Sequence, residues 1–223
     1  MNKSIFEDIG YLDFHTHTMR HQDENGVIEI VSIHLGKERE KEFFTVGLHP
    51  WWSEKIPSEN ELKELRRLLD EPNNLAMGEM GLDNLKGPDL NIQMNILRAQ
   101  LNLAMEFQKP VIIHCVRAFD QLIRIKKEFP KIDKWCVHGF GRHATLAKQL
   151  IDQGFYLSLM PSSDSKYQDW FDSLPHDKLF LETDSMAGVD INEVYQKVSD
   201  VSGLKLEDLR RQINVNATEF FNR

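Results

Sequence analysis

The feature that most constrains the fold is a regular alternation of short apolar runs with longer amphipathic runs. Eight of the short runs have the length and the β-branched or aromatic content of buried strands. They are Tyr11–Phe14, Val27–Ile33, Phe43–Gly47, Leu75–Glu79, Val111–Cys115, Trp135–His138, Phe155–Met160 and Leu179–Thr183. Such alternation is typical of a parallel sheet with crossover helices, and eight strands can close a barrel. We therefore predict an α/β fold, a TIM-type (β/α)8 barrel.

The amphipathic runs predict the helices, because apolar residues recur in them at spacings of three and four. Ser58 and Glu61 form a capping box before a helix through Leu69, and Asp89 opens a long helix through Phe107. The inward residues of the long helix are expected to be Ile92, Ile96, Leu101, Ala104 and Phe107. Further helices are expected over Ala118–Phe129, Ala144–Gln153, Tyr167–Leu174 and, as one helix or two, Leu206–Phe221.

The second crossover is shorter than the others. Between Ile33 and Phe43 there is room only for a short charged stretch, so the barrel is expected to be trimmed there. With 223 residues and a mass of 26.0 kDa, a single domain over residues 1–223 is expected.

The cellular location of the protein and the state of its cysteines can be predicted from the apolar runs and the cysteine positions. No apolar run reaches the roughly 18 residues that span a bilayer, and the first ten residues lack the pattern of a signal peptide. We expect a cytoplasmic protein with no membrane association and no obligate protein partner. Cys115 and Cys136 lie inside strand-like runs and are expected to be buried free thiols.

The formal net charge of -8 disfavours a broad surface that follows nucleic-acid phosphates. It does not exclude contact with one strand end at a metal site. Four neutral imidazoles and two carboxylates around two divalent ions leave a local charge of about +2, which attracts a phosphate.

The clearest local motif is Asp13-Phe14-His15-Thr16-His17 at the end of the first strand. Side chains two apart on a strand face the same way, so both imidazoles can reach one metal ion. Asp13 fits an acceptor for an imidazole N–H behind the ligands. A surface histidine pair and a buried hydrogen-bonded aspartate are the alternatives.

Further ligand-type residues occur where other predicted strands end. They are Glu79, His114, His138 and Asp184. One such residue alone is more often structural, but the carboxyl ends of barrel strands converge on one face, where active sites form. Six ligand-type residues on five strand ends therefore predict a shared metal site.

A set of motifs in this order resembles TatD-type metal-dependent deoxyribonucleases. The motifs are residues 13–17, Gly47-Leu48-His49-Pro50, Gly78-Glu79-Met80-Gly81-Leu82-Asp83, Pro110-Val111-Ile112-Ile113-His114, His138-Gly139-Phe140 and Glu182-Thr183-Asp184-Ser185, with Asn216-Ala217 near the end. The resemblance implies a barrel hydrolase with His15, His17, Glu79, His114, His138 and Asp184 as metal ligands. In a two-metal site Glu79 is the natural bridging ligand. Asp184 could bind one metal and also accept the proton of the attacking water, as in related barrel hydrolases.

This sequence departs from the family pattern around the substrate. The chain is shorter than usual, and an arginine usually found at position 116 is displaced to Arg117. Met186 replaces a proline, and Asn84 and Leu85 replace aromatic residues. The ligand set favours zinc, manganese, iron or nickel, whereas the family is commonly described as magnesium-dependent, so magnesium stays an alternative.

Substrate contacts are expected from His49, Arg117 and Arg142, and Trp51 and Trp52 form either a stacking platform for a base or a hydrophobic lid. Three functions stay open. The first is hydrolysis of phosphodiester bonds at a DNA end. The second is hydrolysis of a small amide, ester, lactone or phosphoester, since one site chemistry serves all of them. The third is a non-catalytic metal-binding barrel, which the presence of all six ligands disfavours.

Overall fold

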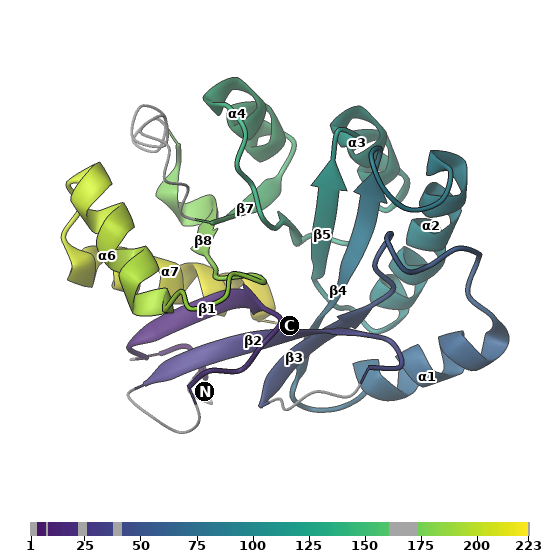
Figure 1. Cartoon of the computed structure of the whole chain (residues 1–223), viewed down its shortest axis with the longest axis horizontal. Helices are drawn as coiled ribbons and strands as arrows, with labels where there is room; N and C mark the ends of the chain where they lie inside the picture. Colours follow the sequence, from purple (N-terminus) through teal and green to yellow (C-terminus); the bar gives the residue numbers. More distant parts are fainter. Residues whose placement is uncertain (1–3, 8, 22–25, 38–41, 161–173, 223) are drawn as a thin grey trace. The chain divides into compact units, whose positions relative to one another are not determined.

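The computed structural model describes residues 4–7, 9–21, 26–37, 42–160 and 174–222 (Figure 1). The chain divides into two compact units. We call residues 1–30 with 139–222 the terminal unit, and residues 31–138 the central unit. The chain passes between the units within its second strand and again after His138. The expectation of a single domain stays a prediction.

Eight strands form one sheet. They are β1 (Tyr11–Thr16), β2 (Val27–His34), β3 (Phe43–Gly47), β4 (Asn74–Asp83), β5 (Val111–Val116), β6 (Trp135–Val137), β7 (Phe155–Leu159) and β8 (Leu179–Leu181). Their order in the sheet is their order in the chain, and the described pairs are parallel. An isolated parallel bridge from Thr16 to Asp184 links β1 with the segment after β8. This is the topology of a TIM-type (β/α)8 fold, as predicted.

The helices follow the predicted positions closely. They are α1 (Glu59–Leu69), α2 (Leu90–Glu106), α3 (Phe119–Glu128), α4 (Ala144–Asp152), α6 (Ile191–Ser202) and α7 (Leu206–Phe221), with a short 3₁₀ helix, η2 (His176–Lys178). Ser58 and Glu61 form the expected capping box at α1, and Asp89 caps α2. The tail is one helix. Helix α6 was not predicted. Residues 167–173 of the helix expected over Tyr167–Leu174 lie outside the described residues.

Each unit has its own core. In the central unit, α2 packs on β4, α1 on β3 and β4, and α3 on β5 (Figure 1). In the terminal unit, α6 and α7 contact β1 and β8, and α4 contacts β7. There the rings of Phe14 and Phe180 stack at a centroid distance of 4.0 Å, with Phe220 against their edges. Strands that are apolar and buried on both faces are typical of parallel sheets covered by helices.

The inward face of α2 differs from the prediction. Ile92, expected inside, is 38% exposed, and Phe107 is only half-buried. Gln93 and Gln100 are buried instead. Both glutamines make pairs of hydrogen bonds with backbone groups of neighbouring loops, and those bonds offset the cost of burying an amide. The buried face of α2 therefore includes these two glutamines, which hydrophobic spacing alone does not indicate.

Three further points concern the strands and loops. Glu79 was expected to end its strand, but β4 continues to Asp83, with an irregular register between Met77 and Met80. Between β2 and β3, residues 35–37 and 42, which are the described ones there, contain no helix, in agreement with the trimmed crossover. Cys115 and Cys136 are buried free cysteines, as expected. No helix of the described residues is long and apolar enough to cross a membrane.

Candidate metal centre

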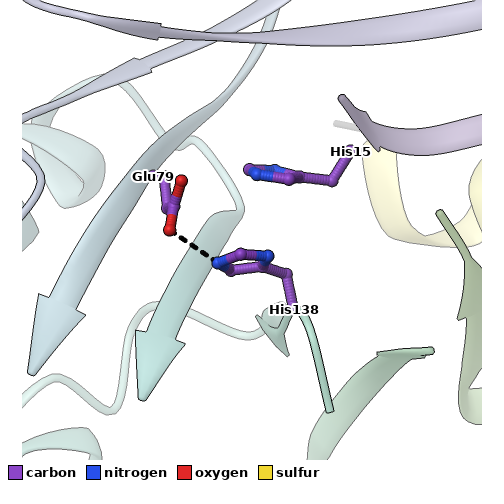
Figure 2. A group of neighbouring side chains, drawn as sticks. All are labelled: His15, Glu79 and His138. Carbon is purple, nitrogen blue, oxygen red and sulfur yellow. Dashed lines mark hydrogen bonds and ion pairs between the residues drawn. The ribbon is translucent and has the colours of Figure 1, made fainter. Parts of the chain in front are cut away.

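In the central unit, three imidazoles converge on one carboxylate oxygen. Glu79 Oε1 lies 2.7 Å from His138 Nε2, 2.9 Å from His49 Nε2 and 3.0 Å from His114 Nδ1. Figure 2 shows the contact between Glu79 and His138 as a dashed line. Glu79 is 5% exposed and His138 is 6% exposed. A carboxylate this buried is stable only when it is paired, and the three rings supply the pairing.

The buried glutamines of α2 form hydrogen bonds with the backbone beside this group. The side chain of Gln100 accepts from Leu48 N at 2.6 Å and donates to Leu48 O at 3.2 Å, immediately before His49. Seven residues earlier on the same helix face, Gln93 accepts from Asp83 N at 2.7 Å and donates to Asp83 O at 2.9 Å. The helix thus fixes the backbone at the ends of β3 and β4.

Asp83 connects His114 to the loop beyond β4. His114 Nε2 lies 3.1 Å from Asp83 Oδ2, and the same oxygen accepts from Trp51 Nε1 at 2.6 Å. Asp83 Oδ1 accepts from Leu85 N at 2.8 Å. Burial raises the pKa of Asp83, but these hydrogen bonds outweigh burial and hold its pKa below the ordinary value. Asp83 is therefore an ionised acceptor that orients the His114 ring.

His49 is set up as a neutral ring. Burial lowers its pKa, although the contact with Glu79 opposes the shift. Its backbone N–H donates to His34 Nδ1 at 3.2 Å. A neutral imidazole can coordinate a metal ion or donate one hydrogen bond, so His49 is available for either task near neutral pH.

In the terminal unit, His15, His17 and Asp184 form a second group. Asp184 Oδ1 lies 3.2 Å from His17 Nε2 and 4.0 Å from His15 Nε2. The backbone holds the aspartate between the histidines, because Asp184 N donates to His15 O at 2.9 Å and His17 N donates to Asp184 O at 3.3 Å. Asp184 has a φ of 50°, in the left-handed region that aspartate tolerates better than most residues.

A polar network behind Asp184 fixes this segment. Arg20 Nη1 donates to Thr183 Oγ1 at 2.8 Å and to Thr16 Oγ1 at 3.0 Å, while its Nη2 donates to Met186 O at 2.9 Å. Asp13 accepts from the Thr183 hydroxyl at 2.5 Å and from Thr183 N at 3.0 Å. Burial raises the pKa of Asp13 to about 8, although both bonds from Thr183 oppose the shift. The role of Asp13 as an imidazole acceptor stays a prediction.

The donor atoms of each group suit a divalent ion. Those of His15, His17 and Asp184 lie within 4.8 Å of one another, as do those of His49, Glu79 and His114. Imidazole nitrogen and carboxylate oxygen bind ions such as Zn²⁺ at about 2.0–2.2 Å, so small movements would let each group close on an ion. The side chains are buried or half-buried, unlike the exposed acidic clusters that are common without a metal.

The residues expected to contact substrate differ in how far they are buried. His49 is buried against Glu79, whereas Arg117 and Arg142 are exposed. Trp51 is half-buried and Trp52 is 45% exposed. These placements leave the substrate roles as predictions.

Two residues that order the groups were not predicted. Asp83 belongs to a quoted motif, Gly81-Leu82-Asp83, which could have indicated its importance. Arg20 has no comparable signal in the sequence, because its partners Thr183 and Met186 are more than 160 residues away.

Comparisons with known proteins agree with this arrangement. The family model for TatD related DNase matches residues 14–222. A "3'-5' ssDNA/RNA exonuclease TatD" of Erwinia tasmaniensis is 30% identical over 148 residues, which cover 63% of this chain and 57% of that protein's length. An "uncharacterized metal-dependent hydrolase YcfH" of Escherichia coli K12 is 28% identical over 203 residues, 83% of this chain and 76% of the relative.

Solved structures show the same fold. The crystal structure of YjjV, a TatD homologue from Escherichia coli K12, superposes with a TM-score of 0.76 at 24% identity and covers 96% of this chain and 98% of its own. A hydrolase TatD family protein from Entamoeba histolytica gives a TM-score of 0.78 at 15% identity, with the same coverage. The resemblance inferred from the motifs is confirmed: the chain belongs to the TatD related DNase family.

Proposed function

We propose that the protein hydrolyses phosphodiester bonds of DNA, from a strand end, with divalent ions held by its two ligand groups. The observation that carries the proposal is the convergence of His49, His114 and His138 on Glu79 within the central unit. When bound, the ions would supply Lewis-acid chemistry, which acidifies a water and neutralises phosphate charge. The exonuclease name of the Erwinia relative supports a nucleic-acid substrate.

The metal ligands are proposed on the family resemblance, because TIM-type active sites form at the carboxyl-terminal side of the strands. They would be His15, His17, Glu79, His114, His138 and Asp184. Four imidazoles favour two ions of zinc, manganese, iron or nickel, with magnesium as the alternative.

The two carboxylates would have different tasks. Glu79 already draws three rings to one oxygen, which suits a ligand shared by two ions. Asp184 is partly solvent-accessible, at 19% side-chain exposure, so it can meet an incoming water and accept its proton. Thr183, held by Asp13 and Arg20, would keep Asp184 in position during that transfer.

Substrate positioning falls to residues around this centre. His49 would donate a hydrogen bond to a phosphate oxygen, and the exposed Arg117 and Arg142 would add charge contacts. The buried free cysteines fit a reducing compartment, and we propose the cytoplasm as the place of action.

The test is hydrolysis of single-stranded and double-stranded DNA by metal-free protein resupplied with Mg²⁺, Mn²⁺ or Zn²⁺. Restored cleavage is expected, with Glu79→Gln and Asp184→Asn each lowering kcat/KM at least about 1000-fold, because each removes a charged ligand with a catalytic role. Glu193→Gln is the matched control, since it neutralises an exposed carboxylate on α6. It should leave cleavage unchanged.

Two outcomes would redirect the proposal. If metal-loaded protein cleaves no DNA, a screen of small esters, amides, lactones and phosphoesters decides whether it is a metabolite hydrolase. If the protein binds metal but hydrolyses none of these substrates, the interpretation as a non-catalytic metal-binding barrel replaces both.

A further inference from the structure

Two tryptophan–lysine pairs lie beside the ligand group of the central unit. Lys86 Nζ lies 3.6 Å above the ring centroid of Trp51, and Lys37 Nζ lies 4.1 Å above that of Trp52. We call them the two Trp–Lys pairs. They come from three loops, those following β2, β3 and β4. In a TIM-type fold these loops border the face where substrate binds.

The first pair is rigidly attached to the ligand group. Trp51 Nε1 donates to Asp83 Oδ2 at 2.6 Å, and the indole meets the rings of His49 and His114 edge-on at 4.9 and 5.5 Å. Lys86 is placed by its own backbone N–H, which donates to Asp83 Oδ1 at 3.1 Å. Asp83 therefore fixes both the indole and the backbone of the lysine that covers it.

The second pair is more open. Trp52 is 45% exposed, which is unusual for an indole so close to a buried site. Its ring lies 4.7 Å from that of His49 and 5.1 Å from that of His34. These contacts hold the indole in place while leaving much of its surface to solvent.

The lysines put positive charge here in a chain whose net charge is -8. Among the residues that the structure describes, neither ammonium forms an ion pair with a carboxylate. A cation above an indole face is held by about 0.5–1 kcal/mol at an exposed site, which is weak enough to be displaced by a stronger partner. A phosphate would be such a partner, and moving the ammonium would uncover an aromatic face.

We infer that the two Trp–Lys pairs bind two neighbouring nucleotides of a single nucleic-acid strand. Each indole stacks a base, and each lysine swings from the ring to the phosphate of that nucleotide. A paired duplex is a poor ligand, because its base faces are already stacked on one another. The inference rests on the proposed function, to which it adds the form of the substrate and the residues that select it.

The experiment measures binding of labelled (dT)8 to the whole chain of 223 residues in EDTA, where the strand is not cleaved. The comparison ligands are an abasic strand of the same length and a hairpin duplex. The wild-type protein should bind (dT)8 most tightly, with quenched tryptophan emission. Trp52→Leu should weaken (dT)8 binding about 10-fold and bring it close to the abasic strand.

The lysines are tested by the salt dependence of binding. Lys37→Met and Lys86→Met should each reduce the slope of log K against log salt concentration by about 0.7, the value for one phosphate contact on a single strand. Lys127→Met is the matched control, because Lys127 is an exposed lysine on α3 of the same unit. Its slope should equal that of the wild type. Trp51→Phe serves as a second aromatic variant, and circular dichroism checks folding.

The outcomes separate the inference from the function on which it rests. Wild-type protein that binds (dT)8 but cleaves no DNA with any metal would overturn the proposed function and leave this binding surface standing. Protein that cleaves DNA while the Trp52 and lysine variants bind like the wild type would overturn the inference. Equal affinity of the wild type for (dT)8 and the abasic strand would overturn it as well.

Discussion

The two candidate metal-binding groups are held in place in different ways. In the central unit, three imidazoles contact one carboxylate oxygen at 2.7 to 3.0 Å, so these side chains hold one another in position. In the terminal unit, the ligand contacts of Asp184 are longer, at 3.2 and 4.0 Å, and order comes from the network of Arg20, Thr183 and Asp13 behind it.

The difference indicates where each group is vulnerable. A mutually braced group fails when its shared partner or the strand that carries it is disturbed. The group of the terminal unit should lose its geometry when a supporting residue that does not itself bind the metal is removed. The predictions below probe this contrast, from the largest expected effect to the smallest.

The largest effect is expected at Gly81, in the strand that carries Glu79. Gly81 has a φ of 155°, and a Cβ there would overlap the backbone carbonyl of His114. Gly81→Ala should lower the free energy of unfolding by about 4 kcal/mol, measured by urea denaturation. Gly36→Ala is the control, with a φ of 83° and nothing within 4 Å of the added Cβ, and should cost about 1 kcal/mol. Equal losses would show that close packing at β4 does not support the group.

Metal addition should come next. Divalent metal at about 100 times its dissociation constant should stabilise the folded protein by about 2.7 kcal/mol, visible as a higher melting temperature. Glu79→Gln should remove most of this gain, since it removes the charge shared by three rings. A full gain in Glu79→Gln would mean that Glu79 holds no metal.

Arg20→Met tests the terminal group. Loss of three hydrogen bonds to Thr16, Thr183 and Met186 should destabilise the protein by about 1–2 kcal/mol. It should also weaken metal binding about 10-fold, measured by titration calorimetry. Arg66→Met, which breaks an ion pair between side chains 42% and 50% exposed, should leave metal affinity unchanged. Identical metal affinities in the two variants would contradict the claim that Arg20 keeps Asp184 in position for the metal.

The effect that is smallest near neutral pH, and that grows only in acid, is a pH dependence at His34. Burial lowers its pKa to about 4 from an ordinary 6.5, and its Nδ1 accepts from His49 N. Below pH 6.5 the His34 ring binds a proton in the unfolded chain but not in the folded chain. The free energy of unfolding should therefore fall as the pH drops from 6.5 to 4. His34→Asn keeps an acceptor near the same place and should flatten this part of the profile. An unchanged profile would exclude His34 as the source.

Much of the fold could be predicted from sequence, and so could most of the side chains that the structure gathers into the two groups. Strand periodicity and the polar residues at strand ends depend on local spacing, which the sequence carries directly. The buried face of α2 could not be predicted in full, because Gln93 and Gln100 face inward to bond the backbone of Asp83 and Leu48, at or just after the ends of β4 and β3. Helix α6 was missed although Asp190 caps its start and Gly203 its end. Arg20 could not be foreseen, since its role depends on contacts that only the folded chain creates.

The most direct test of the account is anomalous diffraction from crystals grown with Mn²⁺ or Zn²⁺. The account predicts two strong peaks, one bound by Glu79 and one bound by His15, His17 and Asp184, at about 2.0–2.2 Å from nitrogen and oxygen ligands. Density only at surface carboxylates, or none at all at saturating metal, would contradict the claim that each of these groups binds a metal ion.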